Sequence, residues 1–342
     1  MPEVDTGKHS TSPQARAGAG LFGVIKKIFT IREINILIIL LALAAFVQSQ
    51  NSHFLTDYNI RIVLKDFSIF GLIAIGETLV ILTAGIDLSP GSMVALTGFV
   101  AALATVHGIP MPIAIGLSLL LAVAVGLMHG LFVTKLGVAP FIITLGTFTI
   151  ARAAAALPTH GTPITGLPDQ FRTIASAHIG PIPLPAIILL VFAAAAVLVT
   201  QYSVLGRDIY AVGGNIEAAR LAGVNVDRRR IFCYVVSTLM AGVAGVIVAS
   251  KIWLGDPGVG QNYELTAISA VVIGGTSLMG GEGTIFGSLL GAAIMSVLAN
   301  AFTFLNVDAY WQPVLIGAIV VVAVTIDSLR RRRKPAMKRI VG

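Results

Sequence analysis

The chain has 342 residues, of which 56% are apolar and 11% are charged, whereas an ordinary soluble domain has about 25% charged residues. Its mean hydropathy is +0.91. So few charges cannot cover the surface of a water-soluble protein of this size, which excludes a typical soluble enzyme, a nucleic-acid-binding domain and a disordered chain. The net charge is +7, and the single cysteine, Cys233, excludes an internal disulfide and a cysteine-based metal cluster.

Ten apolar segments approach the length of about 20 residues that a helix needs to cross the hydrocarbon core of a bilayer. They are 34–49, 62–83, 87–106, 110–134, 138–157, 182–201, 231–250, 264–279, 284–305 and 312–329. The segment 264–279 is short and contains paired glycines, which predicts a broken or re-entrant element that faces protein. The sequence therefore predicts an all-α polytopic membrane protein with about ten transmembrane helices, some of them short or re-entrant.

The basic residues predict the topology, because cytoplasmic segments of membrane proteins are enriched in Lys and Arg. Most of the 23 precede the first span, lie between the sixth and seventh spans, or follow the last span. Both termini are therefore predicted to be cytoplasmic. We expect a tail over 1–33, a transmembrane domain over 34–329 and a basic tail over 330–342. Apolar residues at helical spacing in 21–29 suggest either an interfacial helix or the frayed start of the first span.

One acidic residue, Glu77, lies well inside the second span. A charge in the membrane is costly and usually functional, so Glu77 is a candidate for lining a water-filled path. A buried polar partner, or a position near the headgroups, would explain it equally well. The histidines have no metal-ligand spacing, and His129, inside the fourth span, is expected to bond to a neighbouring helix rather than to be catalytic.

Two patterns of small residues concern packing and symmetry. Gly283, Gly287 and Gly291 recur at every fourth position on the ninth span, which predicts a flat ridge that another helix backbone can approach closely. The stretch 79–92 runs apolar, small, acidic and then Gly-Ser, and 271–288 has a similar order. Such glycine-interrupted segments suggest two pseudo-repeated halves with a transport site between them.

The long connection 203–230 contains signals for a short helix. Asn215 can cap its start, Glu217 in the first turn favours the positive end of the helix dipole, and Gly223 can close its other end. Between these signals lie Ala218, Ala219, Arg220 and Ala222. A small, rigid knob of this kind suits a socket on a cytoplasmic partner. The alternative is an ordinary capped helix on the membrane surface.

The residues from Gly213 to Val226, which read GGNIEAARLAGVNV, resemble the coupling segment of ribose-type sugar permeases of bacterial ABC importers. Three further blocks agree with this family, namely 79–92, 140–147 and 263–283, and the resemblance covers about 35–330 in the same order. Pro90 and Met279 stand where Val or Ala is expected. Glu77 stands where many members have an uncharged residue, which leaves its role open.

The resemblance implies a permease subunit with no catalytic residues, metal or cofactor of its own. ATP and Mg would be bound by a cytoplasmic ATPase with two nucleotide-binding modules. A periplasmic binding protein would deliver a monosaccharide such as ribose, xylose or galactose, and a second permease copy, identical or paralogous, would complete the pathway. The location would be the lipid of the bacterial inner membrane, with no nucleic-acid partner. The alternative is an ATP-independent secondary transporter or channel, in which Glu77 would be the ion site.

The resemblance also assigns residues to roles. The segment that enters the ATPase would comprise Gly213, Gly214, Asn215, Glu217, Ala218, Ala219, Arg220, Ala222 and Gly223. Candidates for lining the pathway are Glu77, Asp87, Phe141, Thr144, Thr147, Thr276, Ser277 and Asn300. For each hydroxyl or amide in this set, the alternative is that a helix carbonyl satisfies it.

Overall fold

The computed structural model describes residues 32–308 and 310–333, and each of the ten predicted segments contains a helix. These are α2 (Arg32–Gln50), α3 (Asp57–Leu82), α4 (Pro90–Val106), α5 (Met111–Lys135), α6 (Pro140–Ala156), α8 (Leu184–Tyr202), α11 (Val226–Ile252), α12 (Tyr263–Ile273), α13 (Ile285–Phe304) and α14 (Trp311–Arg333). The predicted interfacial helix in 21–29 and the tail beyond 333 lie outside the described residues.

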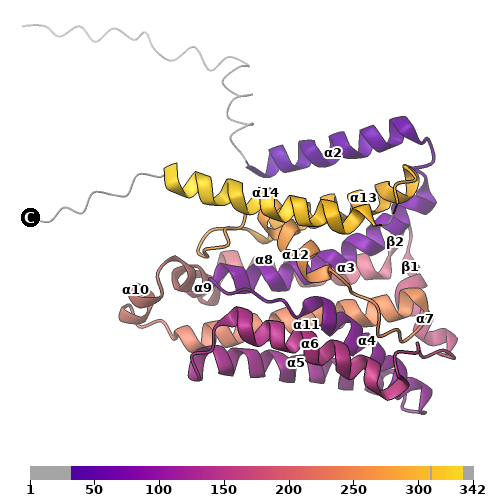
Figure 1. The fold of residues 1–342 in the computed structure, drawn as a ribbon, viewed down its shortest axis with the longest axis horizontal. Coiled ribbons are helices and arrows are strands. Elements are labelled where there is room, and N and C mark those ends of the chain that lie inside the picture. Colours follow the sequence, from indigo (N-terminus) through magenta and orange to yellow (C-terminus); the bar gives the residue numbers. More distant parts are fainter. Residues whose placement is uncertain (1–31, 309, 334–342) are drawn as a thin grey trace, which may run out of the picture.

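The remaining elements lie at the two ends of the bundle (Figure 1). At one end are the 3-10 turn η1 (Leu157–Thr159), α7 (Asp169–Ser176) and a small antiparallel hairpin of β1 (His178–Ile179) and β2 (Ile182–Pro183). At the other end are α9 (Val204–Gly214) and α10 (Ile216–Leu221). The sequence signals predicted a helix at α10 but not the separate helix α9.

Among the described residues, six helices are long and apolar enough to cross a membrane, namely α2, α5, α6, α8, α11 and α13. The chain is therefore a nearly all-helical, polytopic membrane protein. The helix α3 is long but carries several charged residues, and α4 and α12 are shorter apolar helices. At 11 residues, α12 extends about 16 Å, roughly half of the hydrocarbon core. Most of its residues are buried, so the prediction of a short element that faces protein is confirmed.

Burial separates central helices from peripheral ones. Of the apolar window in α11, 67% is buried, and the value for α13 is 61%, whereas α2, α5, α6 and α8 have between 11% and 28%. The central helix α11 packs against α3, α4 and α5, and its Tyr234 and Ile247 join the largest buried apolar cluster. Side chains on the outer helices are mostly exposed Leu, Ile, Val and Phe, as expected where the neighbour is lipid.

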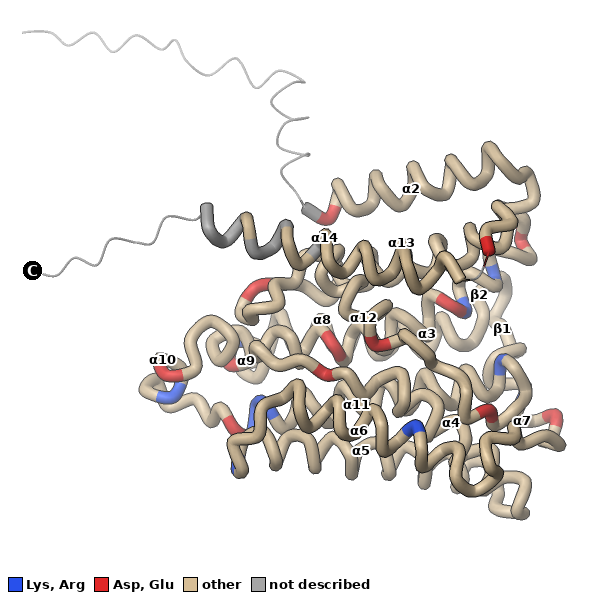
Figure 2. Tube along the Cα trace, in the orientation of Figure 1, with Lys and Arg blue, Asp and Glu red and all other residues tan. Residues whose placement is uncertain are grey.

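Lys and Arg gather towards the two ends of the bundle (Figure 2). At the end with α10 lie Lys135, Arg207, Arg220, Arg228, Arg229 and Arg230, and at or towards the other end lie Arg61, Lys65, Arg152, Arg172 and Lys251. The first turn of α2 and the last turn of α14 also lie at the α10 end (Figure 1). The described chain thus begins and finishes on one side of the bundle, as an even number of crossings requires.

Candidate functional site

The capping residues that the sequence indicated stabilise the two ends of helix α10. The side chain of Asn215 accepts a hydrogen bond of 3.0 Å from the amide of Ala218, and Gly223 adopts a left-handed conformation (φ +83°) just beyond the helix. Glu217 and Arg220 form an exposed ion pair of 3.5 Å, which contributes little to stability. Leu221 is 89% exposed. The capped helix therefore projects from the bundle with this leucine in the open.

By contrast, α9 is fixed to the body of the bundle. Its Ile209 and Val212 are fully buried. Asp208 forms an ion pair of 2.7 Å with Arg229 of α11, and the hydroxyl of Tyr210 donates a hydrogen bond of 2.8 Å to the carbonyl of Gly283. Burial raises the pKa of the Tyr210 hydroxyl, so it stays protonated and able to donate. The projecting helix α10 is therefore attached to a rigid base.

The end of α9 meets Leu82, the last residue of α3 just before loop 83–89, and it meets loop 274–284, which precedes α13. A Cβ on Gly213 would overlap the carbonyl oxygen of Leu82 and lie 2.5 Å from the amide nitrogen of Gly281. That amide donates a hydrogen bond of 3.0 Å to the same Leu82 carbonyl. Leu82 and Gly281 belong to the two similar sequence stretches, 79–92 and 271–288, which the fold places in contact at Gly213. Whether the two halves are structural repeats stays a prediction.

Three predicted pathway residues, Asp87, Glu77 and Thr147, lie in a buried polar cluster, which we define as these three with His129, Tyr234 and Ser237. The hydroxyl of Ser237 donates to Asp87 at 2.8 Å, and the Asp87 amide donates to Glu77 at 3.4 Å. A hydrogen bond of 2.8 Å joins His129 to Thr147, which confirms that His129 bonds to a neighbouring helix. The His129 and Tyr234 rings meet edge to face with centroids 6.0 Å apart.

The buried polar cluster lies against loop 83–89, which contains its member Asp87. The hydroxyl of Thr144 donates to the carbonyl of Ile86 at 3.4 Å, but its shorter bond, of 3.0 Å, goes to Pro140 of its own helix. Within the described chain, Glu77 Oε2, His129 Nδ1 and Tyr234 Oη have no hydrogen-bond partner. An unpaired buried polar group is costly, so these three atoms leave the cluster with hydrogen-bonding capacity that the described chain does not use.

Sequence reasoning missed Tyr234 and Ser237 as members of the buried polar cluster. Both lie on α11, which reads as an ordinary apolar span, and Ser237 is 150 residues from its partner Asp87. The only local signal is a serine within an apolar helix. Among the described residues no group of three His, Cys, Asp or Glu could hold a metal ion.

The other predicted pathway residues do not join this cluster. Thr276 lies 3.4 Å from the hydroxyl of Ser288, which also accepts a bond of 2.8 Å from Thr78. The backbone amide of Ser277 donates a hydrogen bond to the backbone carbonyl of Glu282 within loop 274–284. These contacts tie α3, α13 and loop 274–284 together.

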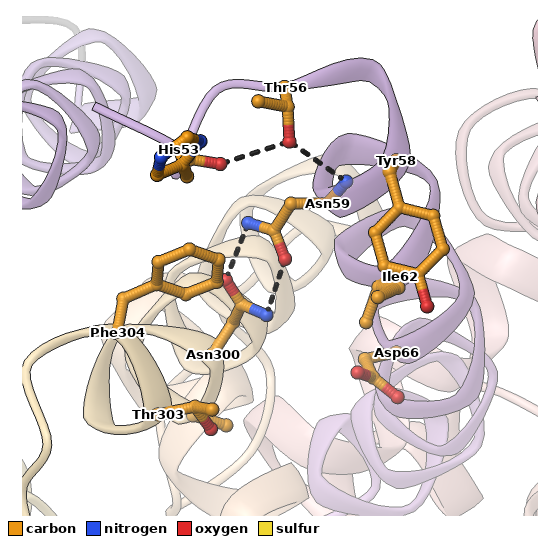
Figure 3. A pocket seen from close by; sticks show the side chains of 10 residues that line it. His53, Thr56, Tyr58, Asn59, Ile62, Asp66, Asn300, Thr303 and Phe304 are labelled. Carbon is orange, nitrogen blue, oxygen red and sulfur yellow. Dashed lines mark hydrogen bonds between the residues drawn. The ribbon is translucent and has the colours of Figure 1, made fainter. Parts of the chain in front are cut away.

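Phe141 and Asn300 lie away from both groups. Phe141 is an exposed residue in the first turn of α6. Asn300 lies on α13 at the end opposite α10, where it forms two hydrogen bonds with Asn59 of α3 (Figure 3). The fold of one chain therefore places the eight predicted residues in separate groups, and whether they line one pathway stays a prediction.

Residues 59–324 match the family described as the branched-chain amino acid transport system / permease component. The chain belongs to this family. It is 40% identical over 301 residues to the ribose import permease protein RbsC of Haemophilus influenzae, with 87% of this chain and 93% of the relative aligned. It is 35% identical over 293 residues to the D-allose transport system permease protein AlsC of Escherichia coli, with 85% and 90% aligned. The xylose transport system permease protein XylH of Escherichia coli is 30% identical over 350 residues, with 84% and 89% aligned. No solved structure matches significantly.

The glycine ridge of the permease differs in part from the prediction. Gly287 and Gly291 lie on α13, where a Cβ on either would overlap a backbone carbonyl of the α12 segment, that of Gly274 or Ala270. Gly283, however, precedes the helix and has φ +155°. The side chain of Thr276 occupies the space that a Cβ on Gly283 would need. Only two of the three glycines therefore form a helix-packing ridge, and the third shapes the loop before it.

We expect Gly291→Ala to destabilise the permease, because the added methyl group must force α13 away from the backbone of Ala270. Overpacking of this kind costs about 1–3 kcal/mol. Gly116→Ala on α5 is the matched control, since its Cβ meets nothing within 4 Å and alanine favours a helix. Thermal unfolding of both variants in detergent checks this, and equal midpoints would contradict the packing role of Gly291.

Proposed function

We propose that the permease is the membrane-spanning subunit of an ATP-driven importer that moves a monosaccharide supplied by a periplasmic binding protein. Its likeness to ribose, allose and xylose permeases over more than four-fifths of its length carries this proposal. A monosaccharide of five or six carbons is the substrate class that these relatives share.

In this proposal the end with α10 faces the cytoplasm, and the end with α7 and the hairpin faces the binding protein. The cluster of Arg at and next to α10 supports this orientation, because positively charged segments remain on the cytoplasmic side. Both ends of the chain are then cytoplasmic, and the membrane that the permease spans is the bacterial inner membrane. A second copy, identical or paralogous, completes the pathway.

The segment from Gly213 to Gly223 docks on the ATPase in this proposal. The exposed Leu221 supports contact with a partner, and the buried side of α9 supports transmission of movement. Because α9 touches the end of α3 and loop 274–284 together, a displacement of α10 reaches both at once. ATP and Mg bind in the ATPase, and the permease converts the motion of its partner into a change of access.

Recovery of the tagged permease from its own membranes in mild detergent tests the proposal. We expect an ATPase with two nucleotide-binding modules to accompany it, and sugar uptake to stop when that ATPase cannot hydrolyse ATP. An oligomer without an ATPase that still moves sugar into liposomes would overturn the proposal and favour a secondary transporter or channel.

Leu221→Asp is expected to reduce both recovery of the ATPase and sugar uptake by more than about tenfold, the factor for about 1.4 kcal/mol of lost contact. The charge would face an apolar socket on the partner. Leu136→Asp is the matched control, since Leu136 is 66% exposed in the short connection between α5 and α6 at the same end. Equal uptake by the two variants would contradict docking through α10.

A further inference from the structure

A pocket of about 490 Å³ lies at the end of the permease opposite α10. One face of α3, the last turn of α13 and the turn before α3 enclose it (Figure 3). Tyr58, Ile62 and Asp66 line one wall at a spacing of four residues, which places them on the same face of α3. From the start of α3 to Asp66, the wall extends about 13 Å into the bundle.

The floor of this pocket is a rigid pair of amides. Asn59 donates to Asn300 at 2.9 Å, and Asn300 donates back at 3.0 Å. Asn59 also donates to the carbonyl of Phe54 and is 2% exposed. An asparagine amide has two N–H donors and two lone pairs on oxygen. Among the described residues the second N–H of Asn300 has no partner, so the pair keeps hydrogen-bonding capacity towards the pocket.

The other polar groups complement a ring with several hydroxyl groups. Asp66 Oδ1 accepts a hydrogen bond from the ammonium group of Lys251, while Asp66 Oδ2 has no donor among the described residues. Thr303 lines the opposite wall, and Tyr58, 77% exposed, stands where it can cover an apolar ring face. Ligand pockets combine apolar and aromatic walls with a few polar groups that orient the ligand.

We propose that this pocket binds the monosaccharide on the side where the binding protein releases it. The amides of Asn59 and Asn300, the carboxylate of Asp66 and the hydroxyl of Thr303 bond the sugar hydroxyls, and the Tyr58 ring covers one sugar face. The inference rests on the proposed function, and it adds a site on the receiving side that lies at the opposite end of the bundle from α9 and α10.

The single cysteine allows a direct test. Because Cys233 is buried, a cysteine introduced at the exposed Thr303 is the one thiol accessible to a maleimide. The full-length Thr303→Cys permease in nanodiscs is labelled with increasing D-ribose, D-allose or D-xylose, and with betaine as an osmotic control. We expect at least one sugar to slow labelling and betaine to have no effect. Tyr310→Cys, at the same end but outside the pocket, should be labelled equally fast with and without sugar.

Two tyrosines supply the matched pair of variants. In the Thr303→Cys background, Tyr58→Ala is expected to raise the half-protecting sugar concentration by about tenfold, equivalent to about 1.4 kcal/mol. Tyr310→Ala, at a tyrosine that is 85% exposed, should leave it unchanged. Absence of protection by all three sugars, or equal effects of both alanines, would overturn the pocket assignment. Because labelling needs no ATPase, this result is separate from failure of ATP-driven uptake, which would overturn the proposed function instead.

Discussion

Gly213→Ala is expected to abolish sugar uptake while the permease still reaches the membrane. The new methyl group would overlap the carbonyl oxygen of Leu82 and press on the amide of Gly281. These are backbone atoms at the ends of two packed segments, so no side-chain rotation can relieve the overlap. The end of α9 must then move away from the end of α3 and from loop 274–284, and the connection from α10 to the interior is interrupted.

Gly214→Ala is the control for this prediction. It adds the same methyl group one residue later in the same helix, where a Cβ meets nothing within 4 Å. We expect normal uptake from Gly214→Ala and at least a tenfold loss from Gly213→Ala, measured with labelled sugar at equal membrane abundance. ATP hydrolysis by the assembled complex provides a second measurement, because an interrupted path leaves hydrolysis without transport. Normal uptake by Gly213→Ala would contradict the role of this junction.

Asp87→Ala is expected to have the largest effect on stability. The carboxyl group accepts bonds from the amide of Ser89 at 2.9 Å, from the hydroxyl of Ser89 at 2.7 Å and from Ser237 at 2.8 Å. The hydroxyl groups can turn to helix carbonyls, but the Ser89 amide cannot. A buried donor without an acceptor costs about 1–3 kcal/mol, so we expect the free energy of unfolding to fall by about 2–4 kcal/mol.

Thermal unfolding in detergent, with sugar uptake measured in parallel, checks the effect of Asp87→Ala. Asp87→Asn keeps one acceptor oxygen for Ser89, and we therefore expect it to be milder. The double variant with Ser237→Ala should lose less than the sum of the two single variants, since both remove the same hydrogen bond. Strict additivity, or a wild-type midpoint for Asp87→Ala, would show that this bond does not hold loop 83–89 against α11.

Local sequence signals predicted most of the helices. Apolar length located all ten segments, and the paired glycines after Ile273 marked the short helix α12. Asn215 and Gly223 marked the ends of α10, because capping depends on residues a few positions apart. The separate helix α9 was missed, since its buried side depends on contacts with distant loops rather than on its own periodicity.

The candidate site was predicted only in part. Polarity inside an apolar span singled out Glu77 and His129, and the fold buries both in one polar cluster. It could not separate Asn300, which lies at the opposite end of the bundle. Regular spacing also placed Gly283 on a helix, whereas its backbone conformation belongs to a loop.

The sequence by itself determined that this chain is a helical membrane protein, because length, apolar content and capping are properties of single segments, and its motif blocks indicated the permease family through their resemblance to it. Only the tertiary structure decided which groups meet. Ser237 reaches Asp87 across 150 residues, and Tyr210 reaches Gly283 across 73. Such contacts are set by the close packing of glycines against distant backbone, at Gly213 above all. That packing joins α9 to the end of α3 and to loop 274–284, and it thereby connects the projecting helix α10 to the interior.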